Sequence, residues 1–271
     1  MLNFLKDLCS NPDNHLFGIY FSLDDSKKIV IPRIVAMEQK IPISVTAKPM
    51  RYQKAINEGD EKSVIYQEYL DKRVKGLEML KKSKTYFKIV DSTDVTCAEE
   101  MFSYMKALQE YVKSIDERNN IIVAIDALDD IRFSTKKFGT TTDRHAETAK
   151  TVKSWAIQLH IPIFGSRHIS KTRNGRCVIE DLKDSNEYEF EANLIFLIHN
   201  DVSKTKQAAQ IFYTSAGSQE KLPVLEINWA KNKVSSYKGY SFCYFIPNYS
   251  LVTECDENDN ERFNSIIYSL L

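Results

Sequence analysis

Short apolar runs alternate with longer helical patterns through the first 166 residues, and this alternation restricts the fold more than any other feature of the chain. The apolar runs are residues 16–23, 87–91, 121–126 and 161–166. The intervening segments carry apolar positions at helical spacing, and they cover residues 27–36, 61–82, 96–115 and 147–160. Strands separated by helices predict a mostly parallel sheet flanked by helices. One further helix is expected over residues 2–10.

The second half of the chain has a different pattern. Apolar strands are expected at residues 194–199, 224–230 and 240–246, with no long helix between them. Such strands favour an antiparallel extension of the sheet. Since no internal repeat and no low-complexity linker separates the halves, we expect residues 1–271 to form a single α/β domain.

Composition excludes several classes of protein. The 37 basic residues balance the 37 acidic ones, so binding to nucleic acid would need a local basic patch. No apolar stretch approaches the roughly 18–20 residues that span a bilayer, and the charged N-terminus does not resemble a secretory signal. Widely spaced cysteines favour reduced thiols in a cytoplasmic protein over a zinc site or disulfide framework; they are Cys9, Cys97, Cys177, Cys243 and Cys255.

A carboxylate closes the apolar strand at residues 121–126. Asp126 is the last residue of this run, and an aspartate at such a strand end can hold magnesium or its water. A strand-end aspartate that caps a turn would explain the same position. The sequence therefore predicts Asp126 as a metal ligand, with a structural role as the alternative.

Five segments resemble the C-terminal motor domain of DnaB-type replicative helicases, which has a RecA-like P-loop NTPase core. Residues 21–24 (F-S-L-D) resemble the family's F-S-L-E, and residues 125–128 (I-D-A-L) resemble its Walker B strand, I-D-Y-L. The other three are residues 147–166, 181–195 and 230–233, the last of which stands where the family has a K-x-R strand end. The segments follow the family's order. The resemblance implies an ATP- and Mg²⁺-dependent helicase that assembles as a hexameric ring around single-stranded DNA.

The resemblance also implies roles for residues at the nucleotide. Asp24 matches a glutamate that polarises the attacking water, although Asp-Asp-Ser also suits a helix N-cap. Asp126 would act in catalysis by holding Mg²⁺. Arg167 stands where the family has a glutamine that responds to the phosphate, and a surface arginine is the alternative. Lys231 and Lys233 match residues that reach the neighbouring subunit's nucleotide, and an exposed basic strand end is the alternative.

Two stretches are expected to contact DNA. Residues 167–176 hold four Lys/Arg in ten positions, and Arg173 and Arg176 are suited to follow the phosphates of single-stranded DNA. In the related helicases, the segment that matches Lys183, Asp184 and Asn186 lines the central channel. Six acidic residues between 180 and 191 would weaken the attraction for DNA, so a solvated loop of mixed charge is the alternative.

No glycine-lysine-serine or glycine-lysine-threonine step, the mark of a phosphate loop, occurs in the chain. In the resembled family this loop precedes a helix like the one expected at residues 2–10, so we expect its strand to be encoded upstream of Met1. Three functions stay open: a helicase motor, a non-hydrolysing DNA- or partner-binding scaffold, and a RecA-like ATPase of another kind. The scaffold is favoured by departures from the family type at Asp24, Arg167, Lys183 and Lys233.

Overall fold

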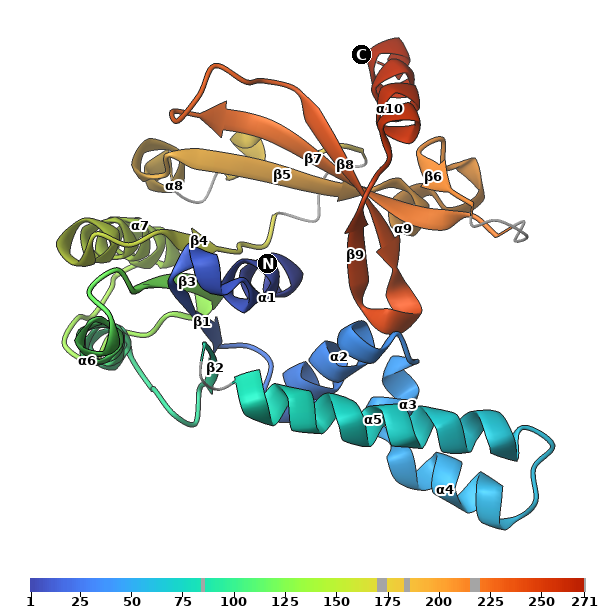
Figure 1. The fold of residues 1–271 in the computed structure, drawn as a ribbon. Helices are drawn as coiled ribbons and strands as arrows, with labels where there is room; N and C mark the ends of the chain where they lie inside the picture. Colours follow the sequence, from blue (N-terminus) through green and yellow to red (C-terminus); the bar gives the residue numbers. More distant parts are fainter. Residues whose placement is uncertain (84–85, 170–174, 183–185, 215–219, 271) are drawn as a thin grey trace. The chain divides into compact units, whose positions relative to one another are not determined.

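The computed structural model describes residues 1–83, 86–169, 175–182, 186–214 and 220–270. The chain divides into two compact units, Met1–His168 and Ile169–Leu271 (Figure 1). Each unit has its own sheet, so each is described by itself. The single domain expected from the sequence stays a prediction.

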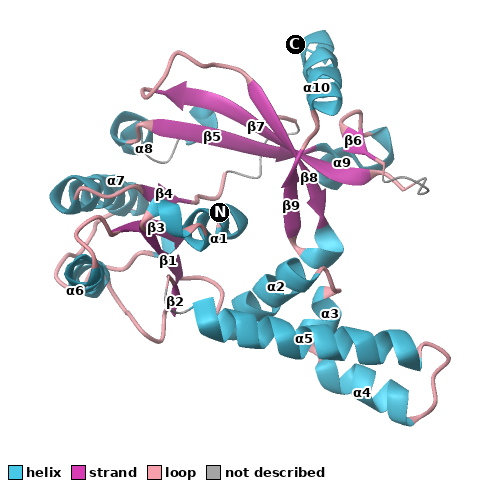
Figure 2. Ribbon diagram, viewed as in Figure 1, coloured by secondary structure: helices cyan, strands magenta, loops and turns pink. Residues whose placement is uncertain are grey.

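A four-stranded parallel sheet forms the centre of the first unit (Figure 2). Its strands lie in the order β2 (Phe87–Asp91), β1 (Leu16–Ser22), β3 (Asn120–Asp126) and β4 (Ile163–Gly165). Every pairing is parallel, so the carboxyl ends of all four strands lie at one edge. β1 and β3 are buried along almost their whole length, which explains their continuous apolar runs.

Helices cover both faces of this sheet. Gly18 of β1 faces Leu5 and Cys9 of the first helix, whereas the ring of Phe21 contacts Tyr104 on the opposite face. The helices of the unit are α1 (Leu2–Ser10), α2 (Lys27–Gln39), α3 (Ile43–Ala47), α4 (Pro49–Asn57), α5 (Ser63–Ser83), α6 (Ala98–Ile115) and α7 (Thr141–Leu159). The alternation of strands and helices is thereby confirmed. Helices α3 and α4 were not predicted.

Helix α7 begins six residues earlier than the sequence pattern predicted. The Thr140 side chain accepts a hydrogen bond from the Asp143 backbone N–H, and the Asp143 carboxylate accepts one from the Thr140 N–H. This reciprocal cap satisfies donors that would otherwise be unpaired at the start of a helix. Capping therefore extends the helix into a polar stretch that has no apolar periodicity.

Gly18 leaves no room for a side chain between β1, β2 and α1. A methyl group at this position would lie 2.8 Å from Phe87 Cδ2 and 2.9 Å from Cys9 Sγ, and both of these residues are buried. We expect Gly18→Ala to lower the free energy of unfolding by about 1–3 kcal/mol, because overpacking forces neighbours off their preferred rotamers. Chemical denaturation measures this change. Gly139→Ala is the control, since the nearest atom there is 3.7 Å away; equal losses in the two variants would contradict the packing argument.

The second unit contains an antiparallel sheet (Figure 1). Its strands lie in the order β5 (Leu194–Asn200), β7 (Leu222–Asn232), β8 (Tyr240–Ile246) and β9 (Leu251–Glu254), with β6 (Phe212–Tyr213) paired to β7. The antiparallel strands predicted from the sequence are thus confirmed, but in the described residues they form a second sheet. The helices are α8 (Asn186–Glu191), α9 (Asp201–Thr205) and α10 (Glu257–Leu270). The core of the unit contains Ile211, Val224, Phe242, Phe263 and Ile267.

Candidate nucleotide site at the carboxyl edge of the parallel sheet

The ends of β1 and β3 lie side by side at the carboxyl edge of the parallel sheet. Ser22 and Asp126 are register partners, and the Leu23 N–H donates a hydrogen bond of 2.7 Å to the Asp126 carbonyl. Asp24 and Asp126, which the sequence predicted as catalytic, are therefore brought to the same edge. Ligands of open α/β sheets bind in the crevice outside the carboxyl ends of the strands.

Hydrogen bonds from two neighbouring strands orient the Asp126 carboxylate. The Tyr20 hydroxyl donates to Oδ2 at 2.6 Å, and the Ser166 hydroxyl, at the end of β4, donates to Oδ1. Burial raises the pKa of Tyr20, and the bond to Asp126 raises it further, so Tyr20 remains a proton donor. Each carboxylate oxygen has two lone pairs, so one hydrogen bond leaves each with capacity for a metal ion. The peptide bond that follows, Asp126–Ala127, is cis.

The amino end of α1 also lies near Asp126. The negative charge of Asp126 acts on Met1, which directly precedes Leu2 of α1, so the start of α1 and Asp126 lie within electrostatic reach of each other. The N–H groups and the dipole of a helix amino end attract anions, and a carboxylate beside them can hold a cation. The two features together fit a phosphate group with its Mg²⁺ ion.

Asp24 is exposed and does not cap the following helix. The N-cap of α2 is Ser26, so the alternative prediction that Asp24 is the N-cap was wrong. Burial raises the pKa of Asp130, and the negative charge of Asp24 raises it further, so Asp24 lies near the turn after β3. This position leaves the Asp24 carboxylate accessible at the same edge as Asp126.

Asp91, at the end of β2, performs the helix-start role that the sequence suggested for Asp24. Its Oδ2 accepts a hydrogen bond of 2.9 Å from the Lys27 N–H, and its Oδ1 accepts bonds from the Thr93 N–H and hydroxyl. Asp91 is only 3% exposed. Sequence reasoning missed this residue, because the helix it serves begins 64 positions earlier in the chain.

The hydrogen bonds of Asp91 give a prediction for acid stability. The Thr93 hydrogen bond lowers the pKa of Asp91 below its value in the unfolded chain, so the carboxylate stabilises the fold above about pH 4. That contribution is lost as the pH falls through the folded-state pKa. We expect the gap in unfolding free energy between wild type and Asp91→Asn to be largest near neutral pH and to shrink below about pH 4. Thr93→Val should begin to lose stability at a higher pH than wild type, because the pKa of Asp91 would be less lowered. A difference in unfolding free energy between wild type and Asp91→Asn that stays constant down to about pH 3 would contradict this account.

Arg167 belongs to a buried cluster with Asp129 and His145. Its side chain is 8% exposed, and Nε donates to Asp129 Oδ1 at 3.2 Å. Nη2 lies 2.9 Å from His145 Nδ1. Arginine cannot accept, so Nδ1 accepts this bond. When His145 is neutral, its proton therefore lies on Nε2, 3.4 Å from Asp129 Oδ1.

This cluster changes the interpretation of Arg167. The guanidinium is neither a surface charge, which was the alternative prediction, nor presented openly to a phosphate. Because Arg167 follows Ser166, the cluster ties the end of β4 to the turn after β3. The sequence carried no signal for Asp129 and His145, since their partner lies 38 and 22 positions away.

The predicted residues of the second unit take part in local contacts. Lys231 Nζ donates to the carbonyl oxygens of Glu189 and Phe190, near the carboxyl end of α8, where positive charge is favourable. Lys233 has an exposed side chain, and its N–H donates to the Asn193 carbonyl at 2.9 Å. Asn186 is exposed at the first position of α8.

Arg176 forms a two-pronged ion pair with Glu226 of β7, at 2.6 and 3.1 Å. Two of its five N–H donors are thus engaged within its own unit. Arg173, Lys183 and Asp184 lie outside the described residues, so their predicted contacts with DNA stay predictions.

Within the described ranges, no group of three His, Cys, Asp or Glu side chains could hold a metal ion. Magnesium in nucleotide sites needs only one or two carboxylates, since the phosphates and waters supply the other ligands. Asp126 fits this requirement. Of the described helices, none combines the length and the apolar character that crossing a membrane requires.

Comparisons of the sequence point to one family. The family model described as "DnaB-like helicase C terminal domain" matches residues 1–245. The replicative DNA helicase DnaB of Mycoplasma pneumoniae is 22% identical over 209 residues, which are 73% of this chain and 39% of that protein. A probable replicative DNA helicase of Trieres chinensis is 23% identical over 221 residues, which are 79% of this chain and 42% of that protein. The chain thus spans about two fifths of the length of these relatives.

Solved structures share the fold. One, described as an ATPase domain, gives a TM-score of 0.73 at 18% identity and covers 93% of this chain and 78% of that chain. Another, of a DnaB-like replicative helicase and its interactions with primase, gives a TM-score of 0.72 at 19% identity and covers 94% of this chain and 55% of that chain. These similarities confirm the RecA-like α/β fold expected from the sequence. Because the family model matches most of its length, the chain belongs to the DnaB-like helicase C-terminal domain family.

Proposed function

We propose that this chain is the motor of a replicative DNA helicase, which couples ATP hydrolysis to translocation on single-stranded DNA in the cytoplasm. The observation that carries the proposal is the convergence at one sheet edge of Asp126, Asp24 and the amino end of α1. An oriented carboxylate beside a helix amino end is the chemistry that a magnesium-bound phosphate requires.

Each residue at this edge has a separate task in the proposal. When bound, Mg²⁺ neutralises charge on the ATP phosphates. Asp126 would hold the ion, and Tyr20 and Ser166 keep its carboxylate in one orientation. Asp24 would orient the attacking water. Arg167 would respond to the phosphate only through its partners Asp129 and His145.

The remaining roles involve other subunits and DNA. We propose a homo-oligomeric ring, six-membered as in the resembled family, in which Lys231 and Lys233 reach the nucleotide of the neighbouring subunit. Arg173, Lys183, Asp184 and Asn186 would line the channel for single-stranded DNA. Support for these roles comes from family membership and from the basic residues between positions 167 and 176.

A non-hydrolysing scaffold is the second candidate function. The Lys231 ammonium is hydrogen-bonded to carbonyl groups of its own unit, which is an arrangement that a structural lysine would also show. Asp24 is one methylene shorter than the family's glutamate, and displacement of a catalytic oxygen by about 1 Å can lower a rate about a hundredfold. Either difference would suit a relative that binds DNA without turnover.

DNA-stimulated ATP hydrolysis distinguishes the two functions. These 271 residues lack a phosphate-loop motif. The assay therefore uses protein purified from its native cells, with whatever further residues it has there. A motor hydrolyses ATP faster when single-stranded DNA is added and displaces a strand from a forked duplex. Binding to DNA with no turnover would support the scaffold and contradict the motor.

A further inference from the structure

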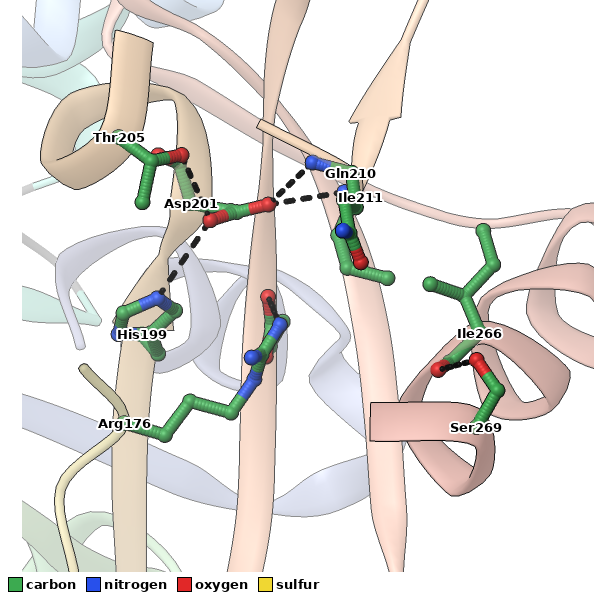
Figure 3. Close-up of polar contacts among 9 residues, drawn as sticks. Arg176, His199, Asp201, Thr205, Gln210, Ile211, Ile266 and Ser269 are labelled. Carbon is green, nitrogen blue, oxygen red and sulfur yellow. Dashed lines mark hydrogen bonds and ion pairs between the residues drawn. The ribbon is translucent and has the colours of Figure 1, made fainter. Parts of the chain in front are cut away.

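Arg176 forms an ion pair with Glu226 of β7. Figure 3 shows Arg176 close to His199 of β5. Nε lies 2.6 Å from Glu226 Oε2, and Nη2 lies 3.1 Å from Oε1. The Glu226 side chain is 1% exposed and the Arg176 side chain is 26% exposed. A two-pronged arginine–carboxylate pair of this kind fixes orientation as well as distance.

The surroundings of the pair leave little room for a ligand. A cavity of about 10 Å³ lies among Arg176, Glu226, His199, Asn228 and Tyr240. That volume holds at most about one water. Neither a base nor a phosphate group fits inside this cavity.

Among the described residues, neither His199 nor Asp201 replaces Arg176 as the counter-ion of Glu226. His199 is the register partner of Glu226 in β5, and burial lowers its pKa, with a further decrease from the Arg176 charge. A neutral His199 supplies no positive charge near neutral pH. Asp201 lies 4.0 Å from His199 but is held by the N–H groups of Gln210 and Ile211 and by the Thr205 hydroxyl. Removal of Arg176 would therefore leave a buried carboxylate without its compensating charge.

The pair connects two parts of the chain to which the proposed function gives different tasks. Residues 175–182 lead directly into Lys183 and Asp184, for which contact with DNA is proposed. β7 carries Glu226 and, five positions later, Lys231, for which contact with nucleotide is proposed. β5 and β8 flank β7, so it is a fixed element to which the preceding segment can be attached.

We propose that Arg176 is a positioning residue, which holds residues 175–182 on strand β7 through Glu226 and does not itself contact DNA. The DNA-contacting and nucleotide-contacting tasks of the two connected segments rest on the proposed function. The attachment of residues 175–182 to β7 does not depend on it. If Arg176 moved to a DNA phosphate, Glu226 would remain buried without its partner. Breaking a buried pair costs more free energy than one exposed contact with a phosphate contributes.

Hydrogen–deuterium exchange tests the attachment without any need for activity. We expect faster exchange in residues 175–182 and in β7 for both Arg176→Met and Glu226→Gln. The double variant Arg176→Met/Glu226→Leu removes the buried charge and should recover protection, since apolar replacement of a buried pair is often tolerated. Arg118→Met is the control, because Arg118 pairs with Asp116 on the surface and is 71% exposed. Unchanged exchange in both single variants would overturn the proposal.

The salt dependence of DNA binding distinguishes positioning from contact. A residue that contacts phosphate contributes about one unit to the slope of log K against log salt concentration. We expect the slope to be the same in wild type, Arg176→Met and Glu226→Gln, while DNA stimulation of ATP hydrolysis falls at least about tenfold in both single variants. A slope lower by about one in Arg176→Met but unchanged in Glu226→Gln would overturn the proposal.

The two proposals fail in different ways. Wild-type protein that shows no DNA-stimulated hydrolysis contradicts the motor, whereas the exchange experiment still decides whether Arg176 holds residues 175–182 on β7. The positioning role alone is contradicted if the wild-type protein shows DNA-stimulated hydrolysis and the slope of log K against log salt concentration falls by about one in Arg176→Met but not in Glu226→Gln.

Discussion

Asp126→Asn is expected to reduce DNA-stimulated ATP hydrolysis by at least about a hundredfold, with little change in the stability of the fold. Asparagine has the shape of aspartate and can keep a hydrogen bond from Tyr20, while the Ser166 hydroxyl can turn to accept from the amide. The negative charge that would hold Mg²⁺ is lost. Metal stabilisation of transition-state charge contributes several kcal/mol, and each 1.36 kcal/mol corresponds to about a tenfold change in rate.

The matched control for Asp126→Asn is Asp130→Asn. Asp130 lies at the same sheet edge, in the turn after β3, and it feels the charge of Asp24. Its loss removes one negative charge from the edge but no proposed ligand, so turnover should remain within about twofold of wild type. A steady-state assay across Mg²⁺ concentrations measures both variants. Equal losses in the two would show that the general charge of the edge, rather than a ligand at Asp126, matters.

Gly165→Ala is expected to lower both stability and turnover, because β4 approaches the turn after β3 without space for a methyl group. An added Cβ would lie 2.6 Å from Cγ, Cδ1 and Cδ2 of Leu128. These atoms form the branched end of a side chain that is itself buried, so rotation of one terminal methyl would not relieve the clash. We expect a loss of about 1–3 kcal/mol in unfolding free energy and a parallel fall in turnover, because Ser166 follows Gly165 and contacts Asp126.

A double-mutant cycle tests this account of Gly165. Leu128→Ala removes the clashing atoms and by itself leaves a cavity, which costs about 2–5 kcal/mol. In the combined variant the new methyl group occupies part of that cavity. The loss of stability in the double variant should therefore be smaller than the sum of the two single-variant losses. Thermal or chemical denaturation of the four proteins gives the coupling free energy. Strictly additive losses would contradict direct contact between positions 165 and 128.

Much of the fold could be predicted because its signals are local. β1 and β3 of the parallel sheet are buried on both faces, so each appears in the sequence as a nearly continuous apolar run. Helix α7 shows the limit of this method, since its first turn depends on the exchange of hydrogen bonds between Thr140 and Asp143 and not on apolar spacing. The short strands β6 and β9 were missed because two and four residues are too few for a periodic pattern.

The candidate site was predictable only in part for a related reason. Asp126 was identified because it ends an apolar strand, and a strand end is visible in the sequence. The Asp129, His145 and Arg167 cluster depends on packing of the turn after β3, α7 and the end of β4. Arg176 was interpreted as a DNA contact because composition shows positive charge but does not show a buried partner 50 positions away.

Metal binding at Asp126 is the most direct test of the central claim that this sheet edge holds a magnesium-bound nucleotide. Mn²⁺ can replace Mg²⁺ as a spectroscopic probe, and its electron paramagnetic resonance signal reports the fraction bound in the presence of a non-hydrolysable ATP analogue. We expect nucleotide-dependent Mn²⁺ binding by the wild-type protein as the cell produces it, and weakening of at least about tenfold in Asp126→Asn but not in Asp130→Asn. Equal Mn²⁺ affinity in wild type and Asp126→Asn would contradict the claim.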